Sequence, residues 1–135
     1  MEPLVLDVDT GEDDALAILL AITDGMPLDT IITSYGRTTI ENATYNTASV
    51  VELASADIEV WMGASGPLSP NAHATDGDLE SKSGSEFAGA NGLCGVTLTP
   101  PQRVTIRRFA DGHQAEEIAR RLRDKGPVHY CVTGP

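Results

Sequence analysis

The chain opens with a short apolar segment that is followed by a longer one of different period. Residues 4–9 form an apolar run into which Asp7 and Asp9 are set, as in a strand that is buried on both faces. From Ala15 onward, apolar residues recur at helical spacing. This change of period predicts a strand, a tight turn and a helix that starts near residues 12–13.

The same alternation continues along the chain. A β-branched run at residues 28–35 predicts a second strand, and apolar positions at helical spacing over residues 40–54 predict a second helix. Residues 58–62 are expected as a third strand. Strands that alternate with helices in this way indicate an α/β fold, a parallel, Rossmann-like sheet with crossover helices.

Residues 63–102 interrupt the pattern as a long polar loop rich in Gly, Ser, Asn and Pro. Beyond it, residues 103–109 are expected as a strand, and the capping-box spacing of Asp111 and Gln114 predicts a helix. Residues 128–133 are expected as a further buried strand. Because this last strand has no return helix, we expect the chain to be the N-terminal part of a larger α/β domain.

Composition narrows the class of protein. Residues 1–135 have the size of a single domain, and their net charge of −11 argues against binding nucleic acid or an anionic membrane surface. The sequence holds no apolar run as long as a membrane span, and no signal peptide is visible. Cys94 and Cys131 share no motif spacing, so we expect reduced thiols in a cytoplasmic protein.

The most informative residues are four carboxylates at the predicted strand-to-helix turn: Asp7, Asp9, Asp13 and Asp14. Two carboxylates about 5 Å apart repel by roughly 3 kcal/mol at an effective dielectric of 20. The helix N-terminus offsets only part of this repulsion. Oxygen-only ligands favour a hard cation, Ca²⁺ or Mg²⁺. The alternative is that Asp13 and Asp14 only cap the helix while Asp7 and Asp9 face solvent.

This run, D-x-D-x-x-x-D-D followed by an apolar helix, resembles the N-terminal signature of the nucleoside hydrolase family of inosine/uridine-preferring type. The resemblance continues in residues 61–68 (WMGASGPL), residues 91–98 (NGLCGVTL) and the final Gly134-Pro135. It implies an incomplete nucleoside hydrolase fold. It also implies hydrolysis of the N-glycosidic bond of small-molecule ribonucleosides to ribose and free base, as in purine and pyrimidine salvage.

The resemblance further implies a Ca²⁺ cofactor and a role for each acid. Asp9 and Asp14 would be calcium ligands, with Asp9 also the general base for a calcium-bound water. Asp13 would hydrogen-bond a ribose hydroxyl, and Asp7 would be a supporting acid. We expect 135 residues alone to supply only half of the site and to be inactive. The base preference and whether the full-length protein forms a homo-oligomer stay open.

Several positions depart from the family pattern. Arg37 stands where the family commonly has an Asn that reaches the ribose, and Ala88 and Asn91 stand at its His and Asp positions. These departures motivate an alternative, a catalytically inactive ribose- or metal-binding relative. A second alternative is a phosphatase of the haloacid dehalogenase type, because Asp7-Val8-Asp9 resembles the D-x-D motif of that family. That family has Thr or Val at the position where this chain has Gly11.

Overall fold

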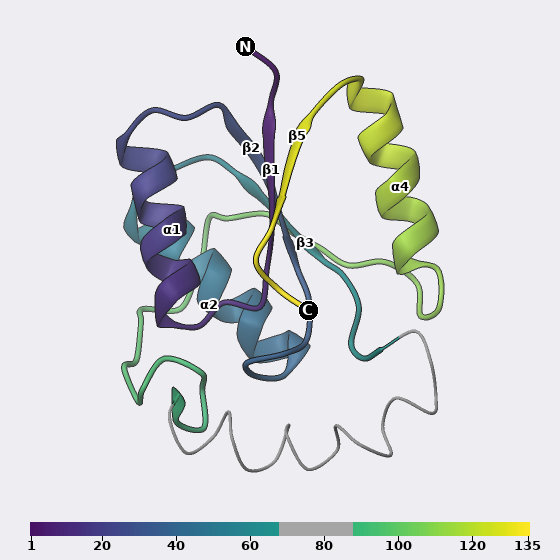
Figure 1. The fold of residues 1–135 in the computed structure, drawn as a ribbon. Coiled ribbons are helices and arrows are strands. Elements are labelled where there is room, and N and C mark those ends of the chain that lie inside the picture. Colours follow the sequence, from purple (N-terminus) through teal and green to yellow (C-terminus); the bar gives the residue numbers. More distant parts are fainter. Residues whose placement is uncertain (68–87) are drawn as a thin grey trace.

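The computed structural model describes residues 1–67 and 88–135, and its strands form one parallel sheet with helices on both sides (Figure 1). In chain order the elements are β1 (Leu4–Val8), α1 (Glu12–Thr23), β2 (Leu28–Thr33), α2 (Ile40–Leu53), β3 (Glu59–Met62), β4 (Ile106–Arg107), α4 (Gln114–Lys125) and β5 (His129–Val132). The strands lie in the order β4-β3-β2-β1-β5, and each neighbouring pair is parallel. The α/β fold expected from the alternating patterns is confirmed.

The core has two layers, one on each face of the sheet. Helices α1 and α2 lie on one face and α4 lies on the other (Figure 1). On the α1 and α2 face the buried strand residues are Leu6, Val8, Ile31 and Val60. On the α4 face, Val5, Ile32 and Trp61 pack with Ile118. Because successive side chains alternate between faces, Asp7 lies on the same face as Val5, towards α4.

The elements predicted from the first half of the chain are found close to their expected bounds. The first helix begins at Glu12, and the next strand, helix and strand match their predictions to within two residues. Gly11 is the N-cap of α1 and has no side chain that could accept a capping hydrogen bond. The acidic residues of the first turn instead interact favourably with the helix dipole.

Three predictions for the second half need correction. The strand expected at residues 103–109 is only Ile106–Arg107. It is an edge strand of the sheet and pairs with β3 on one side. The N-cap of α4 is His113 and not Asp111, so the capping box does not form. The strand expected to be buried at residues 128–133 is exposed along its length as β5, because it is the other edge of the sheet. Of the predicted polar loop, residues 68–87 lie outside the described part of the chain.

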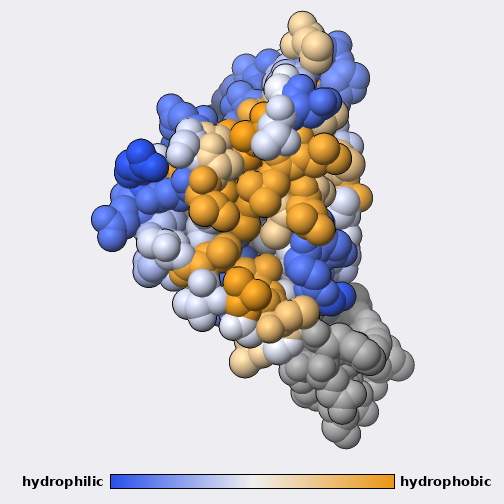
Figure 2. All heavy atoms as spheres, turned by 90° about the vertical axis from the view of Figure 1, so that its left-hand side faces the viewer, coloured by the Kyte–Doolittle hydropathy of each residue, from blue (hydrophilic) through white to orange (hydrophobic). Residues whose placement is uncertain are grey.

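The outer face of α1 is apolar. Leu16 and Leu20 are 68% and 66% exposed, while Ile18, on the opposite side of the helix, is completely buried. Figure 2, which views the molecule from the α1 side, shows a broad hydrophobic area there. Among the described residues, every helix is too short or too polar to cross a bilayer.

Candidate active site at the carboxyl edge of the sheet

The predicted acids lie where β1 ends and α1 begins. Asp9 follows the last residue of β1, and Asp13 and Asp14 belong to the first turn of α1. The connecting turn is held by Thr10, which is fully buried and whose hydroxyl lies 2.6 Å from that of Thr47 in α2. A buried turn of this kind gives the carboxylates a defined position at the carboxyl ends of the strands, the usual location of ligand sites in parallel sheets.

Asp14 is the most buried of the four acids, with 4% of its surface exposed. Its Oδ2 accepts a hydrogen bond from the backbone N–H of Asp9 at 3.1 Å, and its Oδ1 accepts one from the Thr133 hydroxyl at 2.7 Å. Burial raises the pKa of Asp14, and the charges of Asp9 and Asp13 add to this rise, while the two hydrogen bonds lower the pKa. Asp14 is therefore held in place but poorly compensated in charge.

Asp9 is partly buried and its carboxylate is turned towards the turn that follows β2. Its Oδ2 accepts a hydrogen bond of 2.6 Å from the backbone N–H of Arg37. Gly36 makes this approach possible, because a Cβ at that position would lie 2.4 Å from the same oxygen. Gly36 also has φ +152°, which a side chain would strain. The backbone of residues 36–37 thus positions the Asp9 carboxylate.

Asp13 and Asp7 lie on either side of this pair. Asp13 is exposed on the first turn of α1. Asp7 lies towards α4, where its Oδ2 accepts a hydrogen bond of 2.5 Å from the Tyr130 hydroxyl. Burial raises the pKa of Asp7, with a smaller contribution from the charge of Asp9, and burial together with Asp7 raises the pKa of Tyr130. The four acids are thus neighbours, but Asp7 has a partner of its own on the other face of the sheet.

The oxygen donors fit a hard cation only in part. Asp9 and Asp14 both retain lone pairs, and carboxylate oxygens are the ligands that Ca²⁺ prefers. However, Ca²⁺ takes about 6–8 oxygen ligands, and two carboxylates are fewer than that. Within residues 1–67 and 88–135, no three acidic, His or Cys side chains are grouped closely enough to form a metal site. These residues can contribute to a cation site and do not complete one.

Arg37 is the main departure from the family pattern. Its side chain binds Glu12 and not Asp9. Its guanidinium donates to Glu12 Oε1 at 2.6 Å, and the aliphatic part of the side chain lies over Gly11. Arg37 Nε is buried and finds no hydrogen-bond partner within residues 1–67 and 88–135. The backbone of Arg37 therefore binds Asp9, whereas the guanidinium of Arg37 forms an ion pair with Glu12.

The other departing positions have structural roles. Ala88 is completely buried. The side chain of Asn91 accepts from the backbone N–H of Leu93 at 3.0 Å and donates to the carbonyl of Val96 at 2.7 Å. Asn46 of α2 joins this turn to the acidic site, because its amide donates both to the carbonyl of Asn91 and to that of Thr10.

Sequence reasoning missed two partners of the acids, Thr133 and Tyr130. Neither belongs to a motif, and both lie more than 115 residues from the carboxylates that they contact. The one available signal was the expected strand at residues 128–133, because a parallel strand beside β1 would end at the same edge.

Taken together, the fold and the site define a class: a parallel α/β protein with a carboxylate-rich site at the carboxyl edge of its sheet. The family model described as inosine-uridine preferring nucleoside hydrolase matches residues 4–135, and the chain belongs to this family.

Several known proteins are similar to the chain. It is 33% identical to uridine nucleosidase 1 of Arabidopsis thaliana over 138 residues, which cover 99% of this chain and 37% of that protein. It is 32% identical to the pyrimidine-specific ribonucleoside hydrolase RihA of Escherichia coli, with 98% of this chain and 40% of that protein covered. Among solved structures, an inosine-guanosine nucleoside hydrolase superposes with a TM-score of 0.71 at 28% identity, over 96% of this chain and 37% of that one. The chain thus spans about two-fifths of the length of these relatives.

Proposed function

We propose that this chain supplies the N-terminal part of a Ca²⁺-dependent ribonucleoside hydrolase, which cleaves the N-glycosidic bond to give ribose and free base. The observation that carries the proposal is the hydrogen bond from the Asp9 backbone to the Asp14 carboxylate, which holds two acids together at the carboxyl edge of the sheet. Membership of the nucleoside hydrolase family supports the same reaction. It favours hydrolysis of a nucleoside over the phosphatase alternative.

In this proposal, Asp9 and Asp14 are calcium ligands, and Asp9 is also the general base. The cation, when bound, lowers the pKa of a water molecule and offsets the negative charge of the acids. Asp9, held by the Arg37 backbone, then takes the proton from the attacking water. The new C–O bond forms at the sugar carbon, through an oxocarbenium-like state, as the C–N bond breaks. The base leaves with the electron pair of that bond and takes up a proton.

Asp13 and Asp7 have different roles in the proposal. Asp13 is exposed beside the pair and can accept a hydrogen bond from a ribose hydroxyl. Asp7 is a supporting acid, whose contact with Tyr130 keeps it on the α4 face and out of the ligand set. The proposal therefore assigns binding of the sugar to the exposed acid and binding of the metal to the partly and fully buried ones.

The test is calcium binding by this chain, measured by isothermal titration, together with release of ribose from inosine and uridine by the protein as the cell produces it. Asp9→Asn and Asp14→Asn should each weaken calcium binding at least about tenfold, since each removes a charged ligand. Asp24→Asn is the matched control, because Asp24 lies at the opposite end of α1 and is exposed. The absence of both calcium binding and ribose release would contradict the proposal.

The second candidate function is a ribose- or metal-binding relative without catalysis. Arg37 favours it, because an arginine cannot accept a hydrogen bond from a ribose hydroxyl as the family's Asn does. The same assays distinguish the two. Binding of a ribose analogue without any ribose release would support this second candidate, and measurable turnover would exclude it.

A further inference from the structure

Positive charge is concentrated in one region of this acidic chain. Six of its nine Lys and Arg residues lie between Arg107 and Lys125, in β4, α4 and their connection. A groove of about 440 Å³ opens there, and its lining includes Arg107, Arg108, Phe109, His113, Glu117 and Arg121. This arginine groove lies at the β4 edge of the sheet, where β3 and β2 separate it from β1 and its acids.

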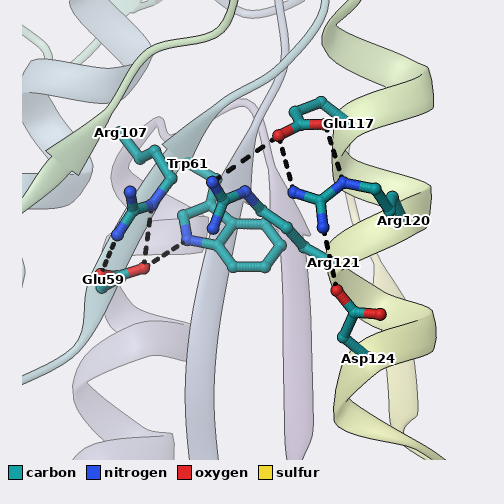
Figure 3. Close-up of polar contacts among 7 residues, drawn as sticks. All are labelled: Glu59, Trp61, Arg107, Glu117, Arg120, Arg121 and Asp124. Atoms are coloured by element: carbon teal, nitrogen blue, oxygen red, sulfur yellow. Dashed lines mark hydrogen bonds and ion pairs between the residues drawn. The ribbon is translucent and has the colours of Figure 1, made fainter.

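Not all of these charges are available to a ligand. Arg107 is committed to Glu59, with Nη2 donating to Oε1 at 2.5 Å and Nε to Oε2 at 3.3 Å, and Trp61 donates to the same carboxylate (Figure 3). Glu117 accepts hydrogen bonds from Arg120 at both of its oxygens, at 2.8 and 3.0 Å, and Arg120 also donates to Asp124 at 3.0 Å (Figure 3). Arg107 and Arg120 are therefore both committed to carboxylates.

Arg121 is held in the groove by aromatic rings more than by carboxylates. Its guanidinium lies 5.6 Å from the ring centroid of Phe109 and 5.9 Å from that of Trp61. Its ion pair with Glu117 is long at 3.7 Å (Figure 3). Its Nε is buried and has no hydrogen-bond partner among the described residues. A guanidinium stacked on rings keeps its donors directed outward at the ring edge, where an anion can reach them.

Arg108 provides a second positive charge at the groove. It is exposed, and its Nη1 donates to the thioether sulfur of Met62 at 3.1 Å, a weak acceptor. In the described part of the chain, Arg108 forms no ion pair. The groove also borders the first turn of α4, whose N-cap side chain makes no capping bond. Backbone amides at a helix N-terminus add favourable potential for an anion.

We propose that the arginine groove binds a small phosphate monoester, with Arg108 and Arg121 as its charged contacts and Phe109 against its organic part. Planar guanidinium groups match the oxygens of a phosphate. The volume lies in the range of small-molecule sites, roughly 300–1,000 Å³. His113 Nδ1 and Glu116 Oε2, which lie 3.4 Å apart, belong to exposed residues that also line the groove.

The chain carries its own reporter for this site. Trp61 is the only tryptophan, and Arg121 lies over its ring, so a ligand on Arg121 should change the tryptophan fluorescence. The titrants are ribose 5-phosphate, inorganic phosphate and ribose at low ionic strength. We expect a saturable change with ribose 5-phosphate, weaker binding of inorganic phosphate and no change with ribose. No saturable change by about 10 mM, or equal binding of inorganic phosphate, would overturn the proposal.

Variants assign the binding to the two arginines. Arg108→Gln should weaken ribose 5-phosphate binding at least about tenfold, and since Arg108 is exposed this variant should fold normally. Arg121→Lys keeps the charge but loses the planar fork, and should also weaken binding; its affinity is measured by titration calorimetry because its Trp61 baseline will differ. Arg123→Gln, in the same helix but outside the groove, is the matched control. Unchanged affinity in Arg108→Gln would contradict the proposed site.

Discussion

At the scale of single residues, Asp14 shows how function opposes stability in this site. Its carboxylate is buried beside two other acids, and only two hydrogen bonds offset its charge. A buried group whose charged form is disfavoured lowers the stability of the folded protein at neutral pH. Such a residue is expected where a bound cation supplies the missing compensation.

Asp14→Asn should therefore increase the free energy of unfolding at neutral pH in the presence of a chelator. Asparagine keeps the size of the side chain and an acceptor for the Asp9 N–H, but removes the desolvated charge. Urea unfolding followed by circular dichroism measures the change. Asp24→Asn serves as the exposed control, and a variant less stable than the wild type would show that the charge is already compensated in the free protein.

Thr10 and Thr47 allow a second test at this scale. The Thr47 hydroxyl donates to the carbonyl of Ala43, so the Thr10 hydroxyl donates to Thr47 across the interface of the acidic turn and α2. Thr47→Val should cost about 1–3 kcal/mol, because it leaves a buried hydroxyl without its acceptor. The double variant with Thr10→Val should recover part of that loss. The four proteins form a double-mutant cycle in urea unfolding, and strictly additive effects would contradict the coupling.

At the scale of elements, α1 serves the site at its N-terminus and the core along one side. Its sequence is apolar almost all round, yet only one stripe is buried against the sheet. A helix that is hydrophobic on all sides is normally buried on all sides. The apolar sequence of α1 therefore does not reveal which of its leucines and isoleucines are buried and contribute to stability.

Ile18→Ala and Leu16→Ala should separate the two sides of α1. Ile18 is completely buried, so its truncation should cost about 2–5 kcal/mol through lost burial and the cavity left behind. Leu16 is two-thirds exposed, and its truncation should change stability by no more than about 0.5 kcal/mol. Thermal and urea unfolding measure both. Equal losses would mean that the outer face of α1 is covered in solution.

At the scale of the whole molecule, charge is distributed unevenly. The chain has a net charge of −11, five of its twenty acidic residues lie between Asp7 and Asp14, and six of its nine basic residues lie between Arg107 and Lys125. Partial burial of Asp7 and burial of Asp14 raise the pKa values of these two acids. In contrast, the pKa of Glu59 is lowered by its hydrogen bonds with Arg107 and Trp61, and the pKa of Glu117 by Arg120.

These opposite shifts predict a stability maximum on the acidic side of neutral pH. Because Asp7 and Asp14 bind protons more tightly in the folded state, the free energy of unfolding should rise as the pH falls from 7 towards their raised pKa values. Below about pH 4, protonation of the groups with lowered pKa values, Glu59 and Glu117, should reverse the trend. Urea unfolding across this range measures the profile. A steady loss of stability from neutral pH downward would contradict it, and Asp14→Asn should flatten the rise.

Much of the fold was predictable from the sequence. The change from period 2 to period 3.6 at residues 4–21 predicted β1 and α1, and the same signal predicted the next three elements. These patterns predict strands and helices well, because each period reflects local backbone geometry together with burial of one side of the element. The four acids were recognisable for the same reason, since their spacing places them at one strand-to-helix turn.

The partners of those acids depended on the tertiary structure. That Thr133 bonds to Asp14, Tyr130 to Asp7 and the Arg37 backbone to Asp9 follows from the pairing of strands far apart in sequence. The exposure of β5 likewise depends on its place at the sheet edge, which an apolar run does not reveal.

The sequence by itself determined the order of strands and helices, the acidic turn and its family signature. Only the tertiary structure decided which acids are buried, which partners hold them, and that an arginine groove exists beside β4. The physical reason is that periodicity and motif spacing are local properties of the chain. Burial, hydrogen-bond partners and pKa values depend on which distant segments the fold brings together.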